Sequence, residues 1–296
     1  MHRSKGFIEL EIFASILKQI PKEQNLIRLH HFGEAILHPY IDKMIETINH
    51  FNLISLISLN PATLSPVLNR KLIAAGINIV CFSLDSFSDE GLFKIRGIKR
   101  PFKECWAMLK NFIENSRNSK RPILKIIQMV DLELNKNDRH IFENIKEKYP
   151  EDDIYIYLSN NYGFGDIDLV EETLPGGSQF LKNDSMPCGA PFSEVSILWN
   201  GDVVLCCYDY DGFNVIGNIK EKTLNKIWND KKILKIRDIF KSRNTHLLPL
   251  CKKCFQAPHN YSDNISFFHK GWEEESTILN ILNSISFNGD YRTKNE

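Results

Sequence analysis

Apolar residues recur along the first 160 positions with two alternating spacings, one typical of helices and one typical of strands. Alternating or continuous apolar runs predict strands at 25–31, 53–59, 77–84, 123–130 and 154–158. Three- and four-residue spacing predicts helices near 8–20, 41–48, 65–76, 102–113 and 138–148. Strand and helix alternate at least five times, which predicts an α/β fold with a parallel sheet. Because βα crossovers are right-handed, an open or closed barrel is the natural architecture.

Polar residues or glycines follow each of the predicted strands: Gly33-Glu34, Asn60, Asp85, Asp131 and Asn160. Ligands bind at the carboxyl ends of the strands in such sheets, so these positions predict a binding rim. Glu34 also fits an acid at a helix start, and Asn60 also fits a turn residue. For Ser83, Asp85 and Arg96 the alternative is pairing at the surface.

Two histidines and two aspartates lie near these stretches. His30 and His31 end the first predicted strand, where a structural or substrate-lining role is more common than a metal site. Asp209 and Asp211 follow a pair of cysteines, and a loop is expected there that lies beside a substrate or simply turns the chain.

The pattern changes after a glycine- and acid-rich stretch at 162–187. Residues 195–206 read as two short strands around Asn200-Gly201, which predicts a β-hairpin with a type I′ turn. Helical runs follow near 224–228, 233–239 and 272–285. We therefore expect three parts: an α/β domain at 1–185, a small second domain at 186–262, and a C-terminal helix and tail at 263–296.

Four cysteines fit one metal site: Cys188, Cys206, Cys251 and Cys254. Four thiolates suit a 4Fe–4S cluster or a structural zinc ion, and the cysteines alone do not choose between them. Cys207 competes with Cys206, but adjacent strand residues face opposite sides, so only one of them is expected to be a ligand. Cys81 and Cys105 lie on apolar stretches and are expected to be core thiols.

Composition excludes several classes of partner. The 37 basic and 37 acidic residues give no net charge, so no general attraction to nucleic acid or to an anionic membrane is expected. No apolar run approaches the ~18 residues of a membrane-spanning helix. The first residues are not followed by the apolar core of a signal peptide, which predicts a cytoplasmic, reducing location. There, clustered cysteines are more often metal ligands than disulfides.

The second half resembles the SPASM or Twitch auxiliary-cluster domain of radical S-adenosylmethionine (SAM) enzymes. Cys188, twelve residues, Gly201, four residues and Cys206 fit the opening signature of that domain, and Cys251-x-x-Cys254 fits its close. Further matches are Pro191-Phe192, Asn200-Gly201-Asp202-Val203, Ile216-Gly217-Asn218-Ile219, Leu224, Ile227-Trp228, Leu234 and Arg237. The resemblance implies one auxiliary 4Fe–4S cluster held by these four cysteines, as in the shorter Twitch form, with the domain at 186–262.

The first half is similar to the barrel of the same enzymes. Gly33-Glu34 resembles the stretch that holds the amino group of SAM, although Ala35 replaces its proline. Stretches that end at Asn60 and at Asp85, with Arg96 beyond, are similar to further SAM contacts. The resemblance implies a cofactor site of Gly33, Glu34, Asn60, Ser83, Asp85 and Arg96, and a partial (β/α)6 TIM-like barrel at 1–185 that lacks its first strand.

One departure from the family is large. The Cys-x-x-x-Cys-x-x-Cys motif that holds the SAM-binding cluster is absent, and no cysteine precedes Cys81. Because the sequence starts where that motif ends in relatives, we expect an N-terminally truncated sequence with a misassigned start at Met1. The alternative is a pseudo-enzyme. Three cysteines in the reading frame upstream of Met1 would favour the first, and a stop codon there the second.

The resemblance implies a radical SAM oxidoreductase or maturase in the full-length protein, with SAM and a second 4Fe–4S cluster as cofactors. Its substrate would be a small polar molecule, such as an aminosugar or cyclitol, or a peptide. A flavodoxin or ferredoxin would supply electrons. The alternative is a non-catalytic iron–sulfur or zinc-binding module that binds peptide or SAM. No catalytic residue is identified.

Overall fold

The computed structural model describes residues 2–21, 26–31, 33–119, 123–130, 144, 147–148, 154–159 and 188–252. The chain divides into two compact units. One comprises Pro21–Asn160 with Phe267–Glu296 and is called the sheet unit below. The other comprises Met1–Ile20 with Asn161–Ser266 and is called the cysteine unit.

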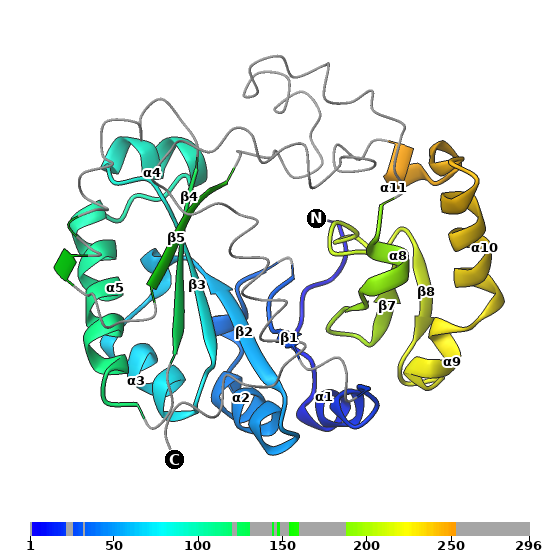
Figure 1. The fold of residues 1–296 in the computed structure, drawn as a ribbon, viewed down its shortest axis with the longest axis horizontal. Coiled ribbons are helices and arrows are strands. Elements are labelled where there is room, and N and C mark those ends of the chain that lie inside the picture. The colour runs from blue at the N-terminus through cyan, green and yellow to red at the C-terminus, as the bar shows by residue number, and fades with distance from the viewer. Residues whose placement is uncertain are drawn as a thin grey trace. The chain divides into compact units, whose positions relative to one another are not determined.

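The sheet unit is built on a parallel sheet of five strands (Figure 1): β1 (Leu26–Arg28), β2 (Ile54–Leu59), β3 (Ile79–Asp85), β4 (Leu124–Val130) and β5 (Ile154–Ser159). The strands lie in sequence order, and each pairs in parallel with the next. This order confirms the α/β fold and the five predicted strands. It is the order that a chain of βα units produces, because each crossover adds the next strand on the same side.

Three helices cover one face of the sheet: α2 (Ile41–His50), α3 (Pro66–Ala74) and α5 (Phe102–Ser116) (Figure 1). Helix α4 (Asp89–Arg96) lies beyond the carboxyl end of β3. Phe82 on β3 packs edge-to-face against Phe112 on α5, with ring centroids 5.2 Å apart. Ser65 caps α3, since its hydroxyl accepts the N–H of Leu68 at 3.2 Å. Short 3-10 turns η1 (Ala35–Leu37) and η2 (Pro61–Thr63) follow the first two strands.

The other face of the sheet carries a small apolar cluster made of Leu26, Ile54, Leu56, Ile79, Cys81, Leu124 and Ile126. These residues recur at every second position, as side chains on one face of a sheet must. Two steps beyond Leu56 and Cys81, the same face reaches Ser58 and Ser83. The face therefore changes from apolar to hydroxyl-bearing as it nears the carboxyl ends of the strands.

Helix α4 was not predicted. Its signals are caps, because the Ser88 hydroxyl accepts the N–H of Gly91 at 3.1 Å and Gly97 ends the helix with φ 67°. The helix brings Arg96 back towards the end of β3.

The predicted core positions of Cys81 and Cys105 are confirmed, since both thiols are buried.

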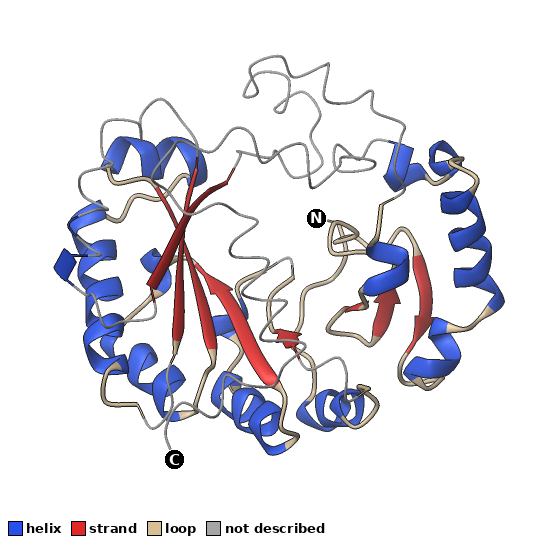
Figure 2. Cartoon of the chain, viewed as in Figure 1, coloured by secondary structure: helices blue, strands red, loops and turns tan. Residues whose placement is uncertain are grey.

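The cysteine unit combines a three-stranded antiparallel sheet with short helices (Figure 2). Its elements are α1 (Leu10–Leu17), α8 (Ala190–Ser193), β6 (Ser196–Ile197), β7 (Asp202–Val204), β8 (Val215–Asn218), α9 (Leu224–Trp228), α10 (Lys231–Lys241), η5 (Thr245–Leu247) and α11 (Pro249–Lys252). Arg237 joins three of the helices: it donates to the carbonyl groups of Pro191 and Trp228, at 2.9 and 3.0 Å, and its guanidinium lies over the Trp228 ring.

The predicted hairpin is confirmed but its predicted turn type is wrong. The N–H of Gly201 donates to the carbonyl of Leu198 at 2.9 Å, and the N–H of Leu198 donates to Asp202 at 2.8 Å. Only Gly201, at φ 93°, has a positive φ in this turn, whereas a type I′ turn needs two such residues. The connection is a three-residue loop that ends in a left-handed glycine. Strand β8, which pairs with β7, was not predicted.

The first twenty residues pack within the cysteine unit. Ile16 of α1 is buried in one cluster with Ile219 and Leu224. The indole N–H of Trp199 donates to the carbonyl of Ser4 at 3.0 Å, and the Gln19 side chain accepts the N–H of Leu224 at 2.7 Å. From the sequence, these first twenty residues were expected to belong to the α/β domain at 1–185. Both expected domain boundaries, at 185/186 and 262/263, fall outside the described residues.

The predicted helices near 138–148 and 272–285 lie wholly or mostly outside the described residues. Within the part of the chain that the structure describes, no helix is both long enough and apolar enough to cross a membrane.

Candidate cofactor and metal-cluster sites

The carboxyl end of β3 carries an ion pair whose carboxylate is buried. Asp85 is fully buried and adopts φ 65°, a left-handed conformation that few residues other than glycine tolerate. Both of its oxygens accept hydrogen bonds from Arg96, through Nε and, at 3.3 Å, through Nη2. Burial raises the pKa of Asp85, and the Arg96 guanidinium offsets part of that rise. Asp85 and Arg96 are therefore brought together, with the carboxylate buried and the Arg96 side chain exposed at the surface.

Glu34 lies at the same edge of the sheet. Burial raises the pKa of Glu34, and the backbone N–H of Asn60 together with the charge of Arg96 partly offsets this effect. The Oε1 atom is buried and has no hydrogen-bond partner among the described residues. A buried, unpartnered carboxylate oxygen suits a ligand with a cationic donor such as an ammonium group. Gly33 precedes it at φ 129°, with open space where a Cβ would lie.

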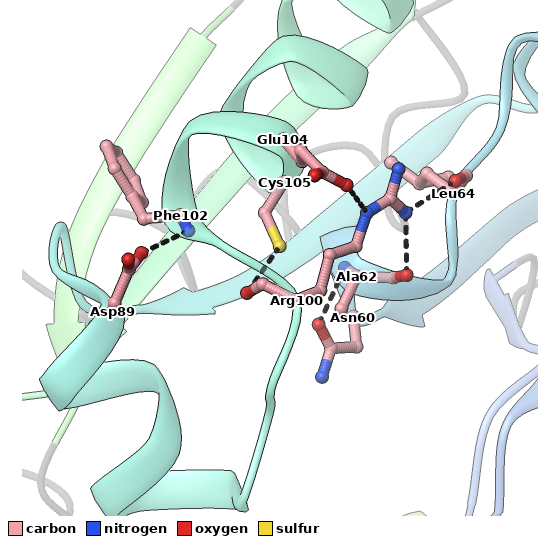
Figure 3. Close-up of polar contacts among 8 residues, drawn as sticks. All are labelled: Asn60, Ala62, Leu64, Asp89, Arg100, Phe102, Glu104 and Cys105. Carbon is pink, nitrogen blue, oxygen red and sulfur yellow. Dashed lines mark hydrogen bonds and ion pairs between the residues drawn. The ribbon is translucent and has the colours of Figure 1, made fainter.

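Asn60 is held by the turn that follows β2 (Figure 3). Its Oδ1 accepts the N–H of Ala62 at 2.9 Å, which leaves the Nδ2 donors and a second Oδ1 lone pair for a ligand. Arg100 fixes this turn from the other side by donating to the carbonyls of Ala62 and Leu64, at 2.8 and 3.1 Å, and to Glu104 at 3.2 Å. Asn60 is thus both the turn residue and a candidate ligand contact.

Two serines and a histidine complete the edge. The hydroxyls of Ser58 on β2 and Ser83 on β3 lie 3.3 Å apart. His30, just beyond β1, accepts the N–H of Ser58 at its Nδ1 atom, 2.9 Å away. The sequence did not predict this hydrogen bond of His30. A bond between a side chain and a neighbouring strand does not change the local pattern of apolar and polar residues.

The pKa of His30 predicts how stability depends on pH. Burial first, and then the charges of Arg28 and His31, lower this pKa from 6.5 to about 4. Between these two values the unfolded chain binds a proton that the folded chain does not, so stability at this site falls as the pH falls from about 6.5 to 4. We expect a loss of about 2 kcal/mol over that window, less than the full shift because the ring is only partly buried.

Urea unfolding of the wild type and of His30→Asn between pH 4 and 7.5 measures this contribution. The raised pKa values of Glu34 and Asp85 act in the opposite direction, so the difference between the two proteins is the informative quantity. The wild type should lose more stability than the variant on acidification. Parallel pH profiles would contradict a neutral, partly buried His30.

Three of the four predicted metal ligands are described, and each lies in a different segment of the cysteine unit. Cys188 precedes α8, Cys206 follows β7, and Cys251 lies in α11. Cys188 and Cys251 pack against one apolar cluster, which contains Leu205, the neighbour of Cys206. Among the described residues, no three His, Cys, Asp or Glu side chains lie close enough together to hold a metal ion. Cys254 lies outside the described residues.

The loop after Cys206 is tightly organised. The carboxylate of Asp209 is fully buried and accepts the N–H groups of Phe213 and Asn214, both at 2.7 Å. The N–H of Asp209 also donates to the carbonyl of Cys206 at 3.1 Å. Asp209 therefore has a structural role. Asp211 has a different one, since it accepts the backbone N–H groups of His2 and Arg3, at 2.6 and 3.2 Å.

The described cysteines fit a thiolate-bound cluster by their chemistry. None of the six forms a disulfide, and Cys188, Cys206 and Cys251 are all partly buried. Burial raises the pKa of the Cys188 thiol, and the N–H of Ala190 partly offsets this rise. A half-buried thiol beside an apolar cluster is inert until a metal draws off its proton. Soft sulfur donors from separate segments suit an iron–sulfur cluster or zinc.

Comparison with known proteins finds one family match, in the second half of the chain. Residues 188–255 match the SPASM family, described as an iron–sulfur cluster-binding domain. The resemblance that the sequence predicted is therefore shown for this segment. A search of curated proteins gave no match.

Solved structures share the fold. BtrN in complex with AdoMet and 2-DOIA aligns over 88% of this chain and 83% of its own, at 16% identity and a TM-score of 0.51. Streptococcus suis SuiB bound to its precursor peptide SuiA aligns over 87% and 66%, at 15% identity and a TM-score of 0.57. The anSMEcpe enzyme with bound AdoMet aligns over 96% and 85%, at 15% identity and 0.54. The fold of this chain is thus similar to the folds of BtrN, SuiB and anSMEcpe.

Proposed function

We propose that this chain is the SAM-binding and auxiliary-cluster portion of a radical SAM oxidoreductase or maturase. The observation that carries the proposal is the combination of a SPASM domain at 188–255 with a polar edge on a parallel sheet. In this proposal Glu34, Asn60 and Ser83 would help to hold SAM, and SAM with a reduced 4Fe–4S cluster would supply the radical chemistry that removes hydrogen from a substrate. The fold likeness supports a partial (β/α)6 barrel for the sheet unit.

The sheet edge contributes the SAM-binding side chains in this proposal. Glu34 holds the amino group of SAM through its unpartnered oxygen, and Asn60 and Ser83 offer neutral polar groups. Asp85 and Arg96 are mutually neutralised, so they position the edge and offer their outer hydrogen-bonding atoms to a ribose or a carboxylate. Each of these assignments pairs a hydrogen-bonding group of the sheet edge with a complementary group of SAM.

The cysteine unit would hold one auxiliary 4Fe–4S cluster through Cys188, Cys206, Cys251 and Cys254. Full cysteine ligation leaves no iron open, which favours electron transfer over substrate anchoring. Flavodoxin or ferredoxin is the class of electron donor that such chemistry needs. The substrates recorded with the similar structures are a small molecule, 2-DOIA, for BtrN and a precursor peptide for SuiB. We propose one of these two classes for this protein.

A second candidate function needs only the groups that these residues supply. The radical reaction needs three thiolates besides the four assigned to the auxiliary cluster. On their own, these residues account for binding of SAM and of an auxiliary cluster. A non-catalytic module that binds SAM or a peptide is therefore the alternative.

Replacing Glu34 with glutamine tests the SAM site. The amide keeps the shape but loses the charge that faces the amino group, so we expect SAM affinity to fall at least about tenfold. Equilibrium dialysis with labelled SAM measures this. Glu46→Gln, an exposed change in the Lys43 pair of α2, is the matched control and should bind like the wild type. Equal affinity in all three proteins would contradict the site.

A further inference from the structure

His30 forms a hydrogen bond that leaves half of its ring uncommitted. The ladder between β1 and β2 ends with the N–H of Leu29 donating to Leu56, at 2.8 Å. At the next step the Nδ1 atom of His30 accepts the N–H of Ser58, at 2.9 Å, in place of a backbone carbonyl. A neutral imidazole that accepts at Nδ1 carries its proton on Nε2. The two ring nitrogens point in diverging directions, so this N–H points away from the Ser58 amide.

The Nε2–H group is a donor in need of an acceptor. Among the described residues none accepts a hydrogen bond from it, and the ring is partly buried. The Nε2 atom is not one of the buried polar atoms that lack a partner, so it can reach solvent, and water or a ligand can accept its hydrogen bond. The ring also stays neutral throughout the physiological range, because its pKa lies near 4.

The surroundings of His30 favour an oxygen-bearing ligand. The bonded residue Ser58 has its hydroxyl 3.3 Å from that of Ser83. Glu34, four residues along the chain, offers a buried oxygen without a partner among the described residues. The edge therefore presents one carboxylate for a cation and several neutral groups for oxygen atoms. SAM has this combination, with an amino group, a carboxylate and ribose hydroxyls.

Charge also favours a neutral imidazole at this place. SAM carries a positive sulfonium group, and an imidazolium close to it would repel it. We propose that the Nε2–H of His30 donates a hydrogen bond to an oxygen atom of SAM bound at the carboxyl edge of the sheet. This inference rests on the proposed function, which places SAM at that edge. It adds a binding residue that the SPASM match and the fold likeness do not assign.

Two substitutions separate the halves of the ring. In His30→Asn the amide oxygen reproduces the Nδ1 acceptor for Ser58 but provides no donor at the Nε2 position. In His30→Gln the longer amide places an N–H near the Nε2 position and gives up the Nδ1 acceptor. We expect His30→Asn to bind SAM about tenfold more weakly and His30→Gln to stay within about threefold of the wild type. Equilibrium dialysis of the full chain with labelled SAM measures both, after urea unfolding has shown that each variant folds.

A second readout does not depend on affinity. With ¹⁵N-labelled histidine, the free protein should show an unprotonated Nδ1 for His30, and SAM should shift its Nε2 resonance. Retained binding in His30→Asn with loss in His30→Gln would overturn the inference and leave His30 a structural residue. So would wild-type affinity in both variants while Glu34→Gln fails to bind. If the wild type itself binds no SAM, the proposed function fails instead.

Discussion

Cys206→Ala should remove most of the iron from the purified protein, whereas Cys207→Ala should keep it. The sequence placed the two cysteines on a strand, but β7 ends at Val204 and they are neighbours in the turn that follows it. Their exposure, rather than strand alternation, therefore distinguishes them. Cys207 is exposed, whereas Cys206 is partly buried and follows Leu205, a member of the apolar cluster that Cys188 and Cys251 also contact. With one thiolate gone, a 4Fe–4S cluster has an iron without a protein ligand and is readily lost.

Iron and sulfide analysis after anaerobic purification measures this effect. We expect about four irons per chain in the wild type and in Cys207→Ala, and fewer than about one in Cys206→Ala. The matched pair controls for expression and for loss of any thiol in this loop. If Cys207→Ala loses iron and Cys206→Ala keeps it, the assignment of the ligand is wrong.

Gly6→Ala should destabilise the cysteine unit by about 1–3 kcal/mol. A Cβ at Gly6 would lie 2.5 Å from Cε3 of the Trp199 ring, too close for any real contact. The ring cannot turn away freely, because its indole N–H donates to the carbonyl of Ser4 at 3.0 Å. The substitution therefore costs either that hydrogen bond or the packing of the first residues on the hairpin.

Gly189→Ala is the matched control for this prediction. The nearest atom to its added Cβ is Ser193 Oγ at 3.8 Å, an ordinary contact, and its φ of −74° suits any residue. Urea unfolding followed by tryptophan fluorescence compares the two variants with the wild type. A Gly6→Ala midpoint equal to that of Gly189→Ala would mean that residues 2–6 do not pack on Trp199 as described.

The main sheet was predictable because its strands are long apolar runs. The run at 77–84 became β3 (Ile79–Asp85), and the run at 123–130 became β4 (Leu124–Val130). Helix α4 and strand β8 were missed for physical reasons. The signals of α4 are caps and first-turn acids rather than an apolar stripe. Strand β8 contains Gly217 and Asn218, poor strand formers, and exists through its pairing with β7.

The candidate site was predictable in position but not in its internal bonds. Strand ends on a parallel sheet share one edge, which is why Glu34, Asn60 and Asp85 could be grouped from the sequence. The pairing of Asp85 with Arg96 depends on the missed helix α4. The bond between His30 and Ser58 depends on the close approach of two strands. Their roles in binding SAM stay predictions.

The packing of the first residues shows the limit of local patterns. The apolar stripe of α1 was predicted, but its partners Ile219 and Leu224 lie about two hundred positions away. The same is true of Asp211, which accepts the N–H groups of His2 and Arg3. Such contacts follow from tertiary packing, and no periodicity in the sequence records them.

The auxiliary cluster is the central claim, and zinc at the same four thiolates is its nearest rival. One measurement separates them most directly: metal and sulfide content per chain of the anaerobically purified wild type, with its visible spectrum. The account predicts about four irons and four sulfides and a brown protein with broad absorption near 400 nm. A colourless protein that contains about one zinc ion and no sulfide would contradict it.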